Sequence, residues 1–210
     1  MSEERAQQLA ELAARAAVCT LCPLAQGRTQ VVFGVGDPDA ELMLVGDAPG
    51  YHEDQQGEPF VGPAGKLLDR LLADIGRRRS QVYIANVLKC RPPGNRDPQQ
   101  PEIDACSDYL RQQLTLVDPR VVLTLGNFAT RLLLKRDVGI SRLRGQVYPW
   151  WNRYLVPTLH PAAVLRSGDH LLSQIKDDFA LAQKALAEQT ALAEQTALAD
   201  PAAEQLGLFG

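Results

Sequence analysis

The sequence contains no apolar run that approaches the roughly 20 residues of a membrane-spanning helix. Its N-terminus lacks the basic and then apolar order of a secretory signal. Cysteine is scarce, with four in 210 residues, and aromatic residues make up only 6%. We therefore expect a cytoplasmic protein of a reducing compartment, without a membrane segment, in which disulfides are disfavoured.

Positive charge is absent from residues 185–210, which contain four acidic residues and neither Lys nor Arg. The net charge of −3 therefore becomes +1 for residues 1–184. Within that part, basic residues gather in three groups, at residues 77–79, 89–96 and 142–166. Each group alone is typical of a solvated face, but together they also favour contact with nucleic acid.

Hydrophobic patterning predicts strands that alternate with helices. The predicted strands are residues 41–46, 82–87, 121–125 and 154–158, and the predicted helices are 3–17, 65–75, 101–116 and 127–135. This order favours a three-layer α/β/α fold with a central, largely parallel four-stranded sheet. Gly46, Asp47, Asn86 and His160 come at or just after the ends of strands, where such folds bind their ligands.

The four cysteines are Cys19 and Cys22, separated by two residues, and the distant Cys90 and Cys106. This spacing suits a centre that ties the N-terminal segment to a remote part of the fold. Four thiolates are the usual ligands of a [4Fe–4S] cluster, and they also bind zinc. Zinc, in a metal-stabilised interaction domain, and a mixture of free and paired cysteines remain alternatives at this point.

The composition changes after residue 184, where Ala-Leu-Ala-Glu-Gln-Thr occurs twice in succession. The six-residue period matches neither a heptad nor a solenoid unit. We predict a domain at residues 1–184, a solvated, helix-prone tether at 185–204, and a separate peptide at 205–210.

Several motifs occur in one order along residues 19–166. They are Cys19-x2-Cys22, Gly46-Asp-Ala-Pro-Gly50 with Glu53-Asp54, Pro59-Phe-Val-Gly62, Tyr83-Ile-Ala-Asn86, Lys89-Cys-Arg-Pro-Pro-Gly-Asn-Arg96, Cys106, Leu143-Arg-Gly145 and His160-Pro-Ala-Ala163. Together they resemble the family 4 uracil-DNA glycosylases, the iron–sulfur branch of the uracil-DNA glycosylase superfamily. The resemblance implies an enzyme that flips uracil out of single- or double-stranded DNA and hydrolyses its N-glycosidic bond, which starts base excision repair.

The same resemblance implies roles for individual residues. The four cysteines would hold the [4Fe–4S] cluster. Asn86 would bind the uracil edge, Phe60 would stack on the flipped base, and His160 would lie over uracil O2. The chemistry fits these residue types, because a donor at O2 stabilises the anion that forms as the bond breaks.

Other implied contacts lie around the base and along the DNA. Ala48 or Glu53 would exclude thymine by crowding C5. Leu165 would wedge into the duplex, and basic residues, Arg144 and Arg166, would hold phosphates.

Asp47 departs from the family pattern, which usually has Glu at this position. The carboxylate is therefore set back by one methylene, and errors of about 1 Å can cost about a hundredfold in rate. We expect Glu53 to carry the main water-activating role, with Asp47 in support. The alternative is a catalytically weakened or non-catalytic, clamp-tethered protein of the same fold that binds uracil-DNA.

The last residues resemble the peptides by which bacterial repair proteins bind the sliding clamp. Gln205 would hydrogen-bond at the edge of the clamp groove, while Leu206, Leu208 and Phe209 would fill its apolar pocket. We thus expect a monomer that works at the bacterial nucleoid, with uracil-containing DNA and the clamp as partners.

Overall fold

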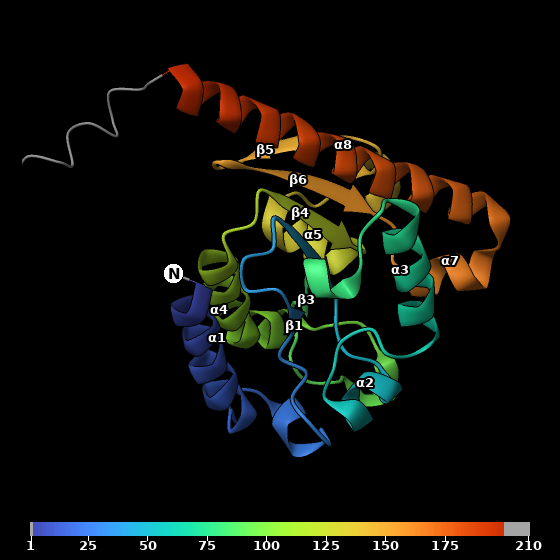
Figure 1. Ribbon diagram of the computed structural model, residues 1–210. Helices are drawn as coiled ribbons and strands as arrows, with labels where there is room; N and C mark the ends of the chain where they lie inside the picture. Colours follow the sequence, from blue (N-terminus) through green and yellow to red (C-terminus); the bar gives the residue numbers. More distant parts are fainter. Residues whose placement is uncertain (1, 200–210) are drawn as a thin grey trace, which may run out of the picture.

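A six-stranded sheet runs through the centre of the molecule, and helices cover both of its faces (Figure 1). The computed structural model describes residues 2–199. The strands are β1 (Val35–Gly36), β2 (Leu42–Gly46), β3 (Tyr83–Asn86), β4 (Val121–Leu125), β5 (Tyr148–Trp150) and β6 (Arg153–Thr158), in the spatial order β1-β3-β2-β4-β6-β5. The α/β/α architecture predicted from the sequence is confirmed.

The four predicted strands form the parallel centre of this sheet, as β3, β2, β4 and β6. The predicted number of strands is wrong, because β1 and β5 add an antiparallel strand at each edge. Both are short, and they contain Gly36 and Pro149, which are typical of strand edges rather than of central strands. Long apolar runs in the sequence therefore do not indicate these two edge strands.

Successive side chains of each central strand point to opposite faces, so both faces of the sheet become apolar. Met43 and Val45 pack with α1 (Ser2–Ala17), α4 (Gln100–Val117) and α5 (Asn127–Leu134). Leu42 and Leu44 pack against the opposite layer, formed by α3 (Pro63–Asp74), α7 (Pro161–Ser167) and α8 (Asp169–Ala199). Shorter elements are α2 (Tyr51–Gln56), α6 (Ile140–Leu143) and the 3-10 turns η1 (Pro23–Gln26), η2 (Arg79–Gln81) and η3 (Pro93–Asn95).

The parallel register aligns the ends of the central strands. Gly46 lies opposite both Asn86 and Leu125, and Leu125 lies opposite Thr158. The loops that follow β2, β3, β4 and β6 therefore all leave from one edge of the sheet. This edge positions the candidate site.

Helix α8 continues beyond the boundary expected after residue 184 and is described as far as Ala199. Ala185 and Leu186 are only 2% and 1% exposed, within the core layer of α3 and α7. The first residues of the predicted tether therefore pack against the domain. The last part of the predicted tether, residues 200–204, lies outside the described residues. Within residues 2–199, none of the helices combines the length and apolar character that a membrane crossing requires.

A buried ion pair joins α8 to the segment before β5. Arg144 donates two hydrogen bonds to the carboxylate of Asp178, of 2.9 and 2.8 Å, and Asp178 has no exposed surface. Thr158 Oγ1 donates a third bond to this carboxylate, of 2.6 Å. The pair thus fixes the end of β6, two residues before His160.

We predict that Arg144→Ala destabilises the protein by about 3–5 kcal/mol, because it leaves the Asp178 carboxylate buried without its cation. Urea unfolding measures the change. Arg142→Ala is the matched control, since Arg142 is exposed and two residues away, and its change stays within about 0.5 kcal/mol. Equal stability of the two variants would contradict the structural role of Arg144.

Candidate functional site

Three groups converge at the end of β2 and β3. Asn86 is 2% exposed, and its side-chain Oδ1 has no hydrogen-bond partner. A Cβ atom built on Gly46 would collide with this oxygen and would lie 2.7 Å from Cζ of Phe60. The missing side chain of Gly46 thus lets an unpaired amide oxygen and an aromatic ring, both predicted to bind a base, pack closely against the end of β2.

The backbone around Phe60 is strained and firmly held. Phe60 has a φ of 55°, which is unfavourable for an aromatic residue. Gly65 is required beneath it, because a Cβ there would collide with the Phe60 carbonyl. Arg79 donates hydrogen bonds to the carbonyls of Pro59 and Phe60, at 2.6 and 3.2 Å. The strain is therefore stored at a residue of the site, where such strain is commonly functional.

His160 follows β6 and caps α7. Its Nδ1 accepts a hydrogen bond of 3.1 Å from the backbone N–H of Ala162. Burial, with a smaller effect of Arg166, lowers the pKa of His160 to about 4. The ring is therefore neutral at pH 7 and carries its proton on Nε2. It stacks on Phe60, with ring centroids 5.7 Å apart. The site thus holds a neutral donor beside the Phe60 ring.

Asp47 follows β2 and faces the start of α5. Its Oδ1 accepts a hydrogen bond of 2.8 Å from the N–H of Ala129. Burial nevertheless raises the pKa of Asp47 to about 7, against the stabilising effect of this N–H and that of Phe128. A Cβ at Gly126 would collide with the other oxygen, Oδ2. This carboxylate therefore changes its charge near neutral pH, as a general base does.

Glu53 holds the loop together through its carboxylate. Oε1 accepts 3.0 Å hydrogen bonds from the backbone N–H groups of Val61 and Gly62, and Oε2 accepts one of 3.1 Å from Gly50. Three backbone bonds to a side chain that is only 9% exposed are typical of a structural carboxylate. This geometry favours Asp47 over Glu53 as the base.

The other predicted contacts differ in how they are placed. Leu165 and Arg166 are exposed on α7, six residues or fewer beyond His160, with Leu165 52% exposed. Ala48 is half-buried and packs against the core layer of α1 and α4. The guanidinium of Arg144 forms an ion pair with Asp178, and the Arg144 side chain is only 17% exposed. These contacts therefore favour a structural role for Arg144 over a contact with DNA phosphate.

The four cysteines line one small cavity between the N-terminal segment, the end of β3 and α4. Cys90 and Cys106 are buried, and Cys19 and Cys22 are half-buried. Burial raises the pKa of the Cys106 thiol to about 11 and also raises the pKa of Cys90. Within residues 2–199, no three His, Cys, Asp or Glu side chains are grouped so as to hold a metal ion.

The sequence did not predict that two basic residues would lie beside this cavity. Arg28 donates to the carbonyls of Cys19 and Ala17, at 2.6 and 3.1 Å, and to Cys90 Sγ at 3.5 Å. Lys89 is 2% exposed, so its assignment to a solvated basic group is wrong. Arg28 has no motif around it, and only its three-dimensional contacts reveal its role.

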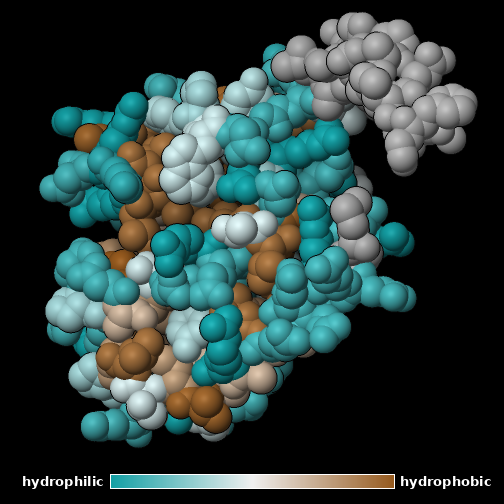
Figure 2. Space-filling model, turned by 90° about the vertical axis from the view of Figure 1, so that its left-hand side faces the viewer, coloured by the Kyte–Doolittle hydropathy of each residue, from teal (hydrophilic) through white to brown (hydrophobic). Residues whose placement is uncertain are grey.

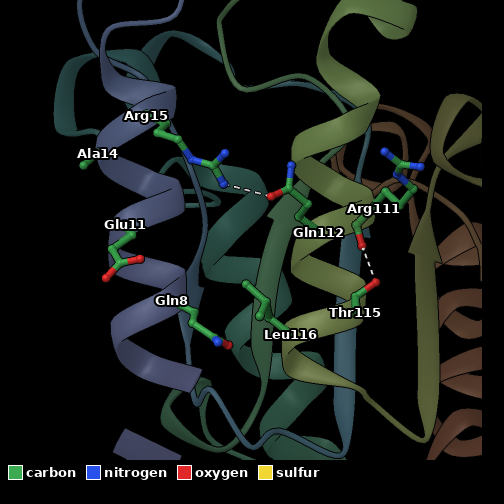
Figure 3. Close-up of a pocket in the computed structure, with 8 residues that line it drawn as sticks. All are labelled: Gln8, Glu11, Ala14, Arg15, Arg111, Gln112, Thr115 and Leu116. Carbon is green, nitrogen blue, oxygen red and sulfur yellow. Dashed lines mark hydrogen bonds between the residues drawn. The ribbon is translucent and has the colours of Figure 1, made fainter. Parts of the chain in front are cut away.

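A larger pocket lies elsewhere, in the groove between α1 and α4 (Figure 3). Arg15 spans the groove with a 2.9 Å hydrogen bond to Gln112. Residues 111–116 belong to the half of α4 that leads back toward the start of β4, away from the edge that carries Asn86. Figure 2 shows this side of the molecule, where hydrophilic and apolar side chains are interspersed. The pocket is therefore separate from the candidate site.

Comparison with known proteins identifies the family. A model of the uracil-DNA glycosylase superfamily matches residues 33–187. A Type-4 uracil-DNA glycosylase of Archaeoglobus fulgidus is 49% identical over 155 residues, which cover 70% of this chain and 78% of the relative. One of Sulfurisphaera tokodaii is 44% identical over 170 residues, or 77% of each chain. A third, of Thermotoga maritima, is 43% identical over 159 residues, covering 75% and 83%.

The family model covers the strands, the convergent groups at the sheet edge and the cavity residues Cys90 and Cys106. The chain therefore belongs to the uracil-DNA glycosylase superfamily, and within it to the Type-4 uracil-DNA glycosylases.

Proposed function

We propose that this protein releases uracil from DNA by hydrolysis of the N-glycosidic bond and so starts base excision repair. The observation that carries the proposal is the buried Asn86 Oδ1, which has no hydrogen-bond partner and packs, like the Phe60 ring, against Gly46. A buried acceptor without a partner costs free energy, so its position is best explained by a ligand that supplies the missing donor.

Uracil has the pattern that this amide requires. Its N3–H can donate to Asn86 Oδ1, and its O4 can accept from the Asn86 amide NH2 group. Cytosine has an acceptor at N3 and a donor at C4, so both hydrogen bonds would be lost. The Phe60 ring provides a face for stacking. The target base reaches these groups only after it is extruded from the helix.

Bond cleavage then separates charge between the base and the sugar. As the bond between C1′ and N1 breaks, negative charge develops on uracil O2, where the neutral Nε2–H of His160 donates. One such donor is typically worth about 3 kcal/mol. A water adds to C1′ of the cationic sugar and gives its proton to the Asp47 carboxylate. The products are free uracil and an abasic site.

We further propose that the four cysteines hold a [4Fe–4S] cluster. Their convergence on one cavity supports a shared centre, and the Arg28 and Lys89 N–H donors to Cys90 and Cys106 suit sulfur ligands that carry negative charge. The cluster would tie the N-terminal segment to the end of β3 and take no part in bond cleavage.

The sliding clamp is the proposed partner at replication sites, with the protein acting as a monomer in the bacterial cytoplasm. The proposed contacts, Gln205, Leu206, Leu208 and Phe209, lie outside the described residues. Their sequence pattern supports the proposal, and tethering would raise the local concentration of enzyme at new DNA.

We predict that deletion of residues 205–210 abolishes co-elution with a bacterial sliding clamp. Activity on short oligonucleotides should stay unchanged, and retained co-elution would contradict the assignment.

The direct test of the activity is uracil release from single-stranded, U:A and U:G oligonucleotides, detected by alkaline cleavage of the abasic product. We expect product from the wild-type protein and a loss of about a hundredfold or more in Gly46→Ala, whose new methyl group would collide with Asn86 Oδ1 and Phe60 and displace them. Gly27→Ala is the matched control, since a Cβ there meets no atom within 4 Å. No product at stoichiometric wild-type enzyme would overturn the proposed function.

The pKa of Asp47, about 7, predicts the pH dependence. If the carboxylate takes up the proton of water, kcat/KM rises about tenfold per pH unit below pH 7 and levels off above it. Asp47→Asn should lower the rate and remove the rise of kcat/KM with pH. The pKa of His160, about 4, is too low to account for it. An unchanged profile in Asp47→Asn would show that another group is the base.

Stability provides an independent control on the same pKa. The folded-state pKa of Asp47 lies above its ordinary value of 3.8, so the charged form opposes folding once the pH exceeds that value. The penalty is complete above about pH 7 and absent well below pH 3.8. Asp47→Asn should therefore raise the free energy of unfolding at pH 8, with the gain fading as the pH falls.

A further inference from the structure

Lys89 is one of the largest fully buried side chains in the described part of the protein. It lies between the end of β3 and the cavity that the four cysteines line. Its contacts are to neutral groups or to sulfur, and the ammonium is 5.7 Å from the centre of the Phe33 ring. Burial of a cation needs compensation from nearby acceptors or negative charge.

The first compensating group is the backbone carbonyl of Asn86. The Lys89 ammonium donates a 2.8 Å hydrogen bond to this oxygen. Asn86 is the last residue of β3, and the next two N–H groups, of Val87 and Leu88, bond to the carbonyls of Gly46 and Asp47. Lys89 therefore holds the residue that reads the base at the point where the chain leaves the sheet.

The second compensating group is the Gln113 side chain on α4. Its Oε1 accepts from the Lys89 ammonium, while its Nε2 donates to the carbonyl of Phe33 at 2.9 Å. Gln113 has no exposed surface, so its amide cannot turn to water for partners. The ammonium therefore has a fixed position relative to α4 and β3.

The third is the sulfur site. The backbone N–H of Lys89 donates to Cys106 Sγ at 3.2 Å, and Cys90 is the next residue in the chain. Four thiolates around an iron–sulfur core carry net negative charge, which would balance the buried ammonium. Lys89 thus joins the two sites, because its backbone N–H contacts the sulfur site and its ammonium holds the last residue of β3.

We propose that Lys89 is a positioning residue, which holds the Asn86 peptide so that the Asn86 amide faces uracil and whose positive charge is paired with the sulfur site. This proposal rests on the proposed function, because uracil is the base that Asn86 is taken to read. It assigns no direct contact between Lys89 and the substrate.

The test compares two variants. Lys89→Met keeps the length of the side chain but removes its donor and its charge, whereas Lys89→Arg keeps the donor and the charge. Lys184→Met is the matched control, because the Lys184 side chain is 74% exposed on α8. The readout is inhibition by free uracil, measured beside affinity for abasic-site DNA. Both are properties of each active molecule, so a lower folded fraction does not change them.

We expect inhibition by free uracil to weaken roughly tenfold in Lys89→Met, the size of one lost charge-assisted hydrogen bond. Lys89→Arg should lie closer to wild type, and affinity for abasic DNA should hold in all variants. Equal uracil inhibition in Lys89→Met and wild type would overturn the proposal. Parallel losses of uracil and abasic-DNA binding would also overturn it, since they indicate a general structural defect.

The reduction potential of the purified brown protein tests the charge pairing without any activity measurement. Loss of a nearby positive charge makes a cluster harder to reduce, so Lys89→Met should shift the potential to a more negative value, whereas Lys89→Arg and Lys184→Met should not. An unchanged potential would overturn the pairing.

If Lys89→Met yields no folded protein, Lys89→Gln replaces it, and equal uracil inhibition in Lys89→Gln and Lys89→Arg overturns the proposal. The wild-type reaction separates this proposal from the proposed function. An inactive wild-type protein contradicts the function, whereas an active wild type with an unaffected Lys89 variant contradicts only the role of Lys89.

Discussion

The parallel pairing of β2 with both β3 and β4 is the constraint on which the site depends. It sets Gly46 opposite Asn86 on one side and opposite Leu125 on the other. A slip of one residue would turn every side chain of β2 to the opposite face and separate these positions. The buried, fully apolar faces of the strand make such a slip costly. The packing of the core thus determines the geometry of the polar edge.

The centre of this fold could be predicted from the sequence, because its strands are buried on both faces and appear as continuous apolar runs. The prediction for Val121–Leu125 matches β4 in both bounds. The edge strands could not be predicted, since β1 has two residues and β5 has three. The candidate site followed from the same logic, because Asn86 and His160 come directly at or after strand ends. The roles expected of these residues came from the resemblance of the motifs to a known family, because position alone does not indicate a role.

The roles of the basic residues were the least predictable part. Lys89, Arg79 and Arg144 all fell in groups interpreted as solvated faces or DNA contacts. Each binds at least one group that is remote in sequence, such as Asp178, which is 34 residues from Arg144. A local pattern of charge contains no information on such partners. Only the fold shows that two of these cations hold backbone carbonyls of residues in the candidate site, Phe60 and Asn86.

The same edge of the sheet contains several groups that are unfavourable in a folded protein. Asn86 Oδ1 has no partner, Phe60 has a strained backbone, and burial acts against the charged forms of Asp47 and His160. Each of these features opposes folding, and the two apolar layers must offset them. The features also fit one chemistry, since each leaves an acceptor, a face, a base or a neutral donor ready for a flipped base. The short Asp47 side chain belongs to this pattern, because its burial beside α5 raises its pKa to about 7.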